Sequence, residues 1–239
     1  MELTNEKIKI QFQALLNKPM DKITPEDLDT IKVMAINSKG LPPAEAEKNA
    51  IEVLKACKKL EELNFTYTFI TKAIAEELGK TNIKRLGFSN CAFENEDNVR
   101  FSPIVNYIKM HNCFLDSYES FLSNLPEALE TLYITYPSDE AIIKTSILKR
   151  LKGLKRLILD GCIVQFDILD LPECNYLSLL GTEITSESAK KISAMPKLQK
   201  MFISRRFNEL DEINELSKKV DIKNDLSEYV FDEDEQKKL

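Results

Sequence analysis

Apolar residues recur along this chain at fixed positions of a short frame, and the clearest copy begins at Leu154 and ends at Val164. Leu154, Leu157, Leu159 and Val164 hold positions 1, 4, 6 and 11 of that frame, with Cys162 at position 9. Copies begin at residues 31, 60, 83, 105, 129, 154, 174 and 198, so 20 to 29 residues separate successive starts. A repeat of this length is typical of a solenoid, whose units pack only against their neighbours.

Within each copy the alternation around positions 4 and 6 predicts one short strand whose aliphatic side chains face the core. Positions 3, 5 and 7 then lie on the opposite face. Position 9 suits a tight inward turn, because a small polar side chain or a thiol there can bond neighbouring backbone groups. That position is occupied by Thr68, Cys91, Cys113, Cys162 and Thr182. Lys39, Pro137 and Arg206 depart from the pattern, which predicts irregular coils at both ends and in the middle.

The segments between the strands predict helices at about 43–57, 71–79, 116–125 and 186–195, whereas 166–171 is too short for more than one turn of tight helix. Ahead of the repeats, Thr4 or Asn5 could cap a helix over 5–17. Thr24 and Pro25 then begin a short helix that reaches Ile31. After the repeats, the apolar spacing over 210–220 predicts a last helix.

This frame resembles the LxxLxLxxN/CxL pattern of the leucine-rich-repeat family, over roughly residues 31–206. The resemblance implies an α/β fold, a curved horseshoe-like solenoid with a parallel concave β-sheet and a mostly helical convex side. Residues 15–28 also look like the helical cap of bacterial internalin-like repeat proteins. We therefore expect a helical N-terminal cap at 1–30, about eight repeats at 31–206, and a C-terminal capping helix with an acidic tail at 207–239.

Charge is distributed unevenly, and this narrows the class of partner. The net charge is −6, and residues 207–239 hold eleven acids and five lysines, so residues 1–206 are neutral overall. A neutral body argues against general binding to nucleic acid or to anionic membranes. No apolar run of about 18 residues predicts a membrane span. We expect a soluble protein, because 30% of the residues are charged.

The cysteines and the N-terminal residues indicate in which cellular compartment the protein is expected. The cysteines number five, which is odd, and they form no CxxC pair, so no metal-site spacing is predicted. Four of them hold inward positions of the frame, where a free thiol acts as a small hydrophobe. A reducing, cytoplasmic location is the simplest expectation. The first residues lack the regions of a secretory signal, but a chain whose signal peptide had been removed would look the same.

No catalytic constellation emerges from the sequence. His111, the one histidine, holds position 7 of its copy and is expected to face the concave side, where a binding or solvated role is favoured over catalysis. Six glycines offer no phosphate-binding loop, and the acidic run at 232–235 is interpreted as a solvated tail rather than a cation site. We therefore expect no enzyme activity, no cofactor and no metal.

The concave positions of the last five copies carry aromatic, aliphatic and arginine side chains. The candidate partner-binding residues are Tyr107, Tyr133, Arg156, Ile158, Tyr176, Leu180 and Phe202. Aromatic residues with arginines on a rigid surface are the composition of protein-interaction hot spots. Strand propensity alone would also favour Tyr, Phe and Ile here. We expect a monomeric protein-binding scaffold; the alternative is a structural or cell-surface adhesion module of a secreted bacterial system.

Overall fold

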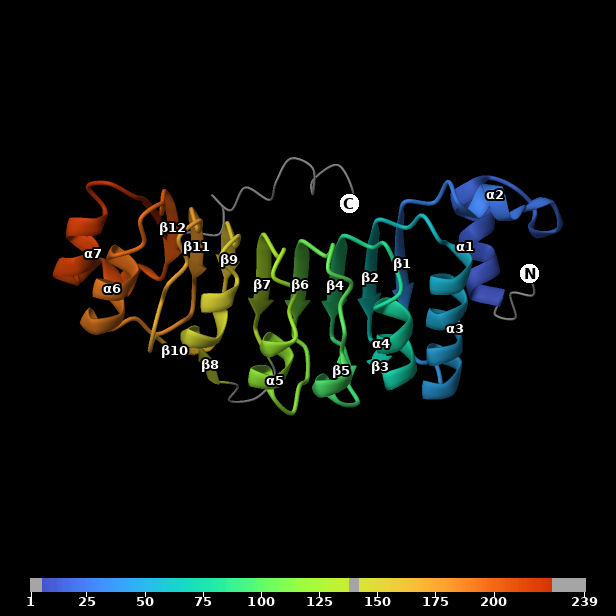
Figure 1. Cartoon of the computed structure of the whole chain (residues 1–239), viewed down its shortest axis with the longest axis horizontal. Coiled ribbons are helices and arrows are strands. Elements are labelled where there is room, and N and C mark those ends of the chain that lie inside the picture. The colour runs from blue at the N-terminus through green and yellow to red at the C-terminus, as the bar shows by residue number, and fades with distance from the viewer. Residues whose placement is uncertain (1–5, 138–141, 225–239) are drawn as a thin grey trace.

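A computed structural model describes residues 6–137 and 142–224, and a parallel sheet of nine strands runs the length of this part of the chain (Figure 1). The strands lie side by side in chain order, each hydrogen-bonded to the next. They are β1 (Val33–Asn37), β2 (Glu62–Thr66), β4 (Arg85–Ser89), β6 (Tyr107–His111), β7 (Thr131–Thr135), β9 (Arg156–Ile158), β11 (Tyr176–Leu179), β12 (Lys200–Ile203) and β13 (Asp221–Lys223).

The pairing register places equal frame positions opposite one another. Leu86 of β4, for example, pairs with Leu63 of β2 and with Ile108 of β6, and all three hold position 4. One strand per copy is therefore confirmed for all eight copies. The ninth strand, β13, was not predicted, because Ile222 is its one apolar residue and so short a segment carries no alternation signal.

Helices and short turns of 3-10 helix connect the strands and cover the opposite side of the sheet (Figure 1). This convex side is formed by α3 (Pro43–Ala56), α4 (Lys72–Leu78), η2 (Glu96–Asn98), α5 (Tyr118–Ser123), η3 (Thr145–Arg150), α6 (Ser186–Ser193), η4 (Arg205–Glu209) and α7 (Asp211–Leu216). Two small parallel pairs add β3 (Phe69–Ile70) with β5 (Ala92–Phe93), and β8 (Ile142–Lys144) with β10 (Ile163–Gln165). The expected α/β solenoid, with a parallel sheet on one side and mostly helices on the other, is confirmed.

Three short helices precede β1: α1 (Glu6–Leu16), η1 (Met20–Lys22) and α2 (Pro25–Leu28). Ile8 and Phe12 of α1 are buried in the common core. Thr24 accepts a hydrogen bond from the backbone of Asp27, and the Asp27 carboxylate accepts one from the Thr24 backbone, so α2 begins where the sequence predicts. The cap proposed at Thr4 or Asn5 lies outside the described residues, and the boundaries at 30 and 206 stay predictions.

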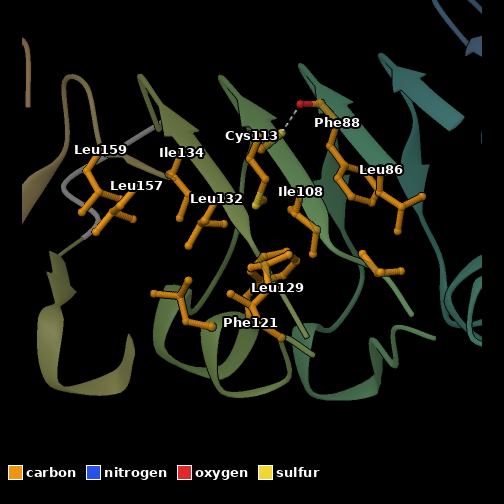
Figure 2. Close-up of a cluster of buried hydrophobic side chains, with 14 of the residues drawn as sticks. Leu86, Phe88, Ile108, Cys113, Phe121, Leu129, Leu132, Ile134, Leu157 and Leu159 are labelled. Carbon is orange, nitrogen blue, oxygen red and sulfur yellow. Dashed lines mark hydrogen bonds between the residues drawn. The ribbon is translucent and has the colours of Figure 1, made fainter. Parts of the chain in front are cut away.

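The core is one continuous cluster between sheet and helices. Figure 2 shows the position-4 side chains Leu86, Ile108 and Leu132 in a row on the side of the sheet where Phe121 of α5 lies. Such a layer buries each apolar side chain against the coil before and the coil after it. Fully burying a leucine or phenylalanine contributes about 1.5–3 kcal/mol, so the stability of the fold is spread along its length.

Position 9 forms a ladder from coil to coil. The Sγ atom of Cys113 donates to the carbonyl oxygen of Phe88 at 3.4 Å (Figure 2), and Cys162 donates to Ile134 at 3.3 Å. The hydroxyl of Thr182 donates to Leu159 at 2.6 Å. Each acceptor is position 6 of the preceding coil, so the predicted bonding role of position 9 is confirmed for these residues.

The ladder departs from the frame where the sequence has a large or rigid residue. Lys39 is exposed, and Ser38 is buried in its place with its hydroxyl 3.0 Å from that of Thr68. Arg206 is also exposed, with its guanidinium over the ring of Phe207. Pro137 is half-buried, and Asp139, which holds position 11 of the same copy, lies outside the described residues.

Position 8 has a backbone requirement that the sequence analysis missed. Six successive coils place this residue in the left-handed region, with φ between 48° and 73°. They are Tyr67, Asn90, Asn112, Tyr136, Gly161 and Gly181. Asparagine and glycine tolerate this conformation, whereas a bulky side chain is strained in it. The Asn and Gly residues at a fixed position of the frame were the available signal.

Candidate protein-binding surface

The concave face consists of the side chains at positions 3, 5 and 7 of successive strands, which point away from the helices. The strand register aligns position 3 as Val33, Glu62, Arg85, Tyr107, Thr131, Arg156, Tyr176, Lys200 and Asp221. It aligns position 5 as Ala35, Asn64, Gly87, Lys109, Tyr133, Ile158, Ser178, Phe202 and Lys223. The sequence predicts both rows correctly through β12.

Aromatic side chains from different strands meet on this face. The rings of Tyr107 and Tyr133 lie 5.5 Å apart between centroids, and Ile158 belongs to the same buried cluster, against which Tyr176 packs. The Tyr176 ring lies 5.5 Å from that of Phe202. Five of the seven candidate residues thus form one chain of contacts from β6 to β12, and tilted rings at these separations are the favourable geometry for aromatic pairs.

Basic side chains lie over the rings. The Arg85 guanidinium is 3.7 Å from the centroid of Tyr107, and the Arg156 guanidinium is 4.7 Å from that of Tyr176. The Lys200 ammonium is 5.2 Å from the centroid of Phe202. Each cation–π contact contributes about 0.5–2 kcal/mol. Arg156, the sixth candidate, therefore belongs to the same assembly as the aromatic residues.

The expectation of an exposed aromatic patch is wrong. Ile158 and Phe202 are 0% exposed, Tyr133 is 3% exposed, and Tyr107 and Leu180 are each 8% exposed. Parallel strands lie about 4.8 Å apart, so large side chains on neighbouring strands touch and contribute to burying one another. Arg156 and Tyr176 are half-buried and retain accessible surface. The partner-binding role of the seven residues stays a prediction.

Asp160 holds position 7, which the frame places on the concave face, and its side chain forms an internal network. Its Oδ1 atom accepts a hydrogen bond of 2.6 Å from the Ser178 hydroxyl and one of 2.9 Å from the backbone N–H of Leu180, the seventh candidate. Burial raises the pKa of the Asp160 carboxyl, and the two hydrogen bonds oppose that rise. Asp160 and Leu180 therefore connect β9 to the end of β11.

We next consider the side chains that could act as a general base, a nucleophile or a metal ligand. The Nδ1 atom of His111 lies 2.9 Å from the Thr135 hydroxyl, and its ring meets the Tyr136 ring edge-on at 6.0 Å. All five cysteines are buried thiols, and burial raises the pKa of Cys57 and of Cys174 to about 12. Across residues 6–137 and 142–224, no three His, Cys, Asp or Glu side chains gather as a metal site would require. Over the same ranges no helix combines the length and apolarity needed to span a bilayer.

A second surface row was missed by the sequence analysis. Phe69, Phe114 and Ile163 hold position 10, beside the ladder, and are 42%, 49% and 51% exposed. Ile142 pairs with Ile163 in the small β8–β10 sheet and is equally exposed. The available signal was the presence of large apolar residues at a frame position outside the repeating apolar pattern of positions 1, 4, 6 and 11.

The repeated strand, the parallel sheet and the ladder together define the architecture. The fold is that of a leucine-rich-repeat solenoid. No protein-family model and no curated protein matches the sequence. Among solved structures, the chain is similar to internalin C2 from Listeria monocytogenes, with 15% identity over 87% of this chain and 81% of that one and a TM-score of 0.48. It is also similar to a chain of the Rad7–Elc1 complex in yeast, with 15% identity over 88% of this chain and 66% of that one and a TM-score of 0.41.

Proposed function

We propose that the chain is a non-catalytic scaffold that binds a protein partner on its concave face. The observation that carries this proposal is the assembly of Tyr107, Tyr133, Ile158, Tyr176 and Phe202 with the guanidinium of Arg156. Tyrosine and arginine dominate the binding energy of protein interfaces. The strands are already ordered, so association costs little conformational entropy on this side.

A binding role fits the chemistry of the polar groups better than catalysis does. His111 contacts a hydroxyl and an aromatic edge, and neither can orient it as a general base in the way a carboxylate does. Burial raises the pKa of the Cys57 and Cys174 thiols to about 12, which disfavours the nucleophilic thiolate at these two residues. The proposal therefore needs no cofactor, and it treats the chain as a monomer.

The test is partner capture by variants of the more accessible residues. Affinity purification from native lysate with mass spectrometry would identify the partner, and a binding assay with that partner would follow. Arg156→Ala and Tyr176→Ala are expected to weaken binding about 30-fold each, as for hot-spot residues worth about 2 kcal/mol. Tyr133→Ala is less informative, because a side chain so buried also contributes to stability.

Lys152→Ala is the matched control for Arg156→Ala. Lys152 is exposed and forms a surface ion pair with Asp170 at 2.5 Å, a contact expected to contribute under about 1 kcal/mol to stability. Unchanged affinity of Arg156→Ala, in a variant whose melting temperature equals that of the wild type, would remove the concave face as the site.

The exposed position-10 row favours a second candidate, a structural or cell-surface adhesion module of a secreted bacterial system. Phe114 and Ile163 expose apolar surface that adhesive contacts could bury. Under this alternative, Phe114→Ser and Ile163→Ser lower partner capture, and Arg156→Ala does not. A signal peptide upstream in the gene would favour the same candidate.

A further inference from the structure

Towards β12 the concave face carries buried aromatic side chains together with basic ones, and the last residues of the chain include aromatic and acidic ones. We propose that residues 225–239 of the same chain bind along this face from β12 towards β4. In this arrangement Tyr229 and Phe231 contact the aromatic assembly, and the acidic run at 232–235 pairs with the basic side chains beyond it. The inference rests on the proposed function, since it assigns an acidic, aromatic peptide as the occupant of the same surface.

Charge complementarity is the first argument. Positions 3 and 5 of the nine strands carry five basic side chains: Arg85, Lys109, Arg156, Lys200 and Lys223. The acidic residues in these rows are Glu62, paired with Arg85 at 3.0 Å, and Asp221, paired with Lys223 at 3.5 Å, so the two rows keep a net charge of +3. Residues 225–239 contain six acids and two lysines. A face with net positive charge therefore adjoins an acidic segment of the same chain, and their attraction is stronger near an apolar surface than in bulk water.

Length is the second argument. The described chain ends at Asn224, directly after β13 at the edge of the sheet, and its side chain donates to the carbonyl of Ile203 at 3.1 Å. Strands about 4.8 Å apart place β7 about 19 Å and β4 about 29 Å from β13. An extended chain advances about 3.3 Å per residue, so Phe231 reaches about 23 Å and the run at 232–235 reaches about 26–36 Å. The aromatic residues thus fall over β12 to β7, and the acids over Lys109 and Arg85.

Burial on the concave face is the third argument. Positions 3 and 5 of β1, Val33 and Ala35, are exposed, whereas position 5 is fully buried in Ile158, Ser178 and Phe202. Neighbouring residues cover these three side chains, because Ile158 and Phe202 flank Ser178 and its hydroxyl bonds to Asp160. The accessible surface that remains on this part of the face belongs to the half-buried Arg156 and Tyr176. Tyr229, Val230 and Phe231 are the apolar residues of the segment that would contact this remaining surface.

The test uses the full chain with the photoreactive residue p-benzoylphenylalanine in place of Phe231. After irradiation, mass spectrometry of digested monomer is expected to show crosslinks to peptides that contain β7 to β12. Crosslinks between two chains would replace the proposal with a second copy as occupant. Crosslinks confined to the convex side, or none, would overturn it.

A charge-neutral variant sharpens this result. A quadruple variant keeps side-chain size and removes the charge: Asp232→Asn, Glu233→Gln, Asp234→Asn and Glu235→Gln. It is expected to lower the intramolecular crosslink yield at least threefold. A rise in salt concentration is expected to lower the yield of the wild type in the same way. The matched control, Lys237→Gln with Lys238→Gln, is expected to leave the yield unchanged or raise it. Equal yields from the quadruple variant and the wild type would contradict the electrostatic part of the proposal.

Partner capture separates this inference from the proposed function. If both hold, the quadruple variant captures the partner more strongly, because the face is less occupied. If crosslinks fail while Arg156→Ala still weakens capture, the self-binding inference alone is wrong. If crosslinks form as expected while Arg156→Ala and Tyr176→Ala leave capture unchanged, the concave face serves the chain's own segment and the proposed function is wrong.

Discussion

Strands β1 and β12 use the same frame but present different concave faces. In β1, positions 3, 5 and 7 are exposed and positions 4 and 6 are buried, which is the alternation of a sheet with one solvated face. In β12, Met201, Phe202 and Ile203 are buried in succession, so both faces are covered. Register decides which face a side chain occupies, whereas the size and partners of its neighbours decide whether that face meets water.

The largest difference in the free energy of unfolding is expected for substitutions at position 7. Asp160→Ala should lower the free energy of unfolding by about 2–3 kcal/mol, because it leaves the buried Ser178 hydroxyl and Leu180 N–H without their acceptor. Asn37→Ala, the same position in β1, should cost under about 0.5 kcal/mol, since its one bond to the Lys39 N–H is exposed. Urea unfolding followed by circular dichroism measures both, and similar losses would contradict the comparison.

The charge of Asp160 gives this contrast a pH dependence. Because burial raises its pKa in the folded state above the unfolded value, its contribution favours folding below the unfolded pKa and is lost as pH rises through the folded pKa. Asp160→Asn keeps the oxygen that accepts both hydrogen bonds and removes the charge. The stability of the wild type relative to this variant should therefore increase as the pH is lowered from neutral, and a flat difference between the two would contradict the assignment.

The sequence predicts the repeat well because one apolar frame recurs eight times, and errors in a single copy do not shift the register. Leu154 and its equivalents identify the core, and Cys162 and Thr182 identify the ladder, from residue type and spacing alone. The ninth strand and the left-handed position 8 were missed. The first depends on edge pairing with β12 rather than on its own residues, and the second is a backbone requirement that tyrosine at two coils obscures.

The sequence predicts which residues lie on the concave face, but it does not predict how much of each side chain is exposed. Alternation places Tyr133 and Ile158 on the concave face, yet alternation carries no information about contacts between strands 20 residues apart in sequence. Asp160 shows the same limit, because its partners Ser178 and Leu180 belong to the next coil. Periodicity assigns a face, and lateral contacts then decide whether a residue on that face serves stability or binding.

The position-9 ladder is expected to contribute the same stability near β1 as near β12. Thr182→Val and Thr68→Val each remove a buried hydroxyl while keeping its shape, and each should cost about 1 kcal/mol. Thr182 loses its bond to the Leu159 carbonyl, and Thr68 loses its contacts with the Thr66 carbonyl and the Ser38 hydroxyl. Chemical denaturation of the two variants in parallel measures the effect. A cost confined to Thr182 would mean that the ladder, too, weakens towards β1.

The smallest expected effect has the opposite sign. Tyr67 near β2 and Tyr136 near β7 both hold position 8 with positive φ, where the neighbouring coils have asparagine or glycine. Replacing either with asparagine should relieve about 1 kcal/mol of backbone strain. Part of this gain is offset, because Tyr67 loses the Lys39 ammonium 5.1 Å from its ring and Tyr136 loses its contacts with His111 and Gly161.

A net stabilisation of about 0.5 kcal/mol is therefore expected for each variant, read as a small rise in the denaturation midpoint with an unchanged slope. Tyr67 follows the second strand of the sheet and Tyr136 follows the fifth, but both side chains are about half exposed, so burial cannot separate them. Equal gains would show that position 8 is governed by the backbone alone. A loss at Tyr136 with a gain at Tyr67 would show that the contacts of the Tyr136 ring outweigh the backbone strain at that coil.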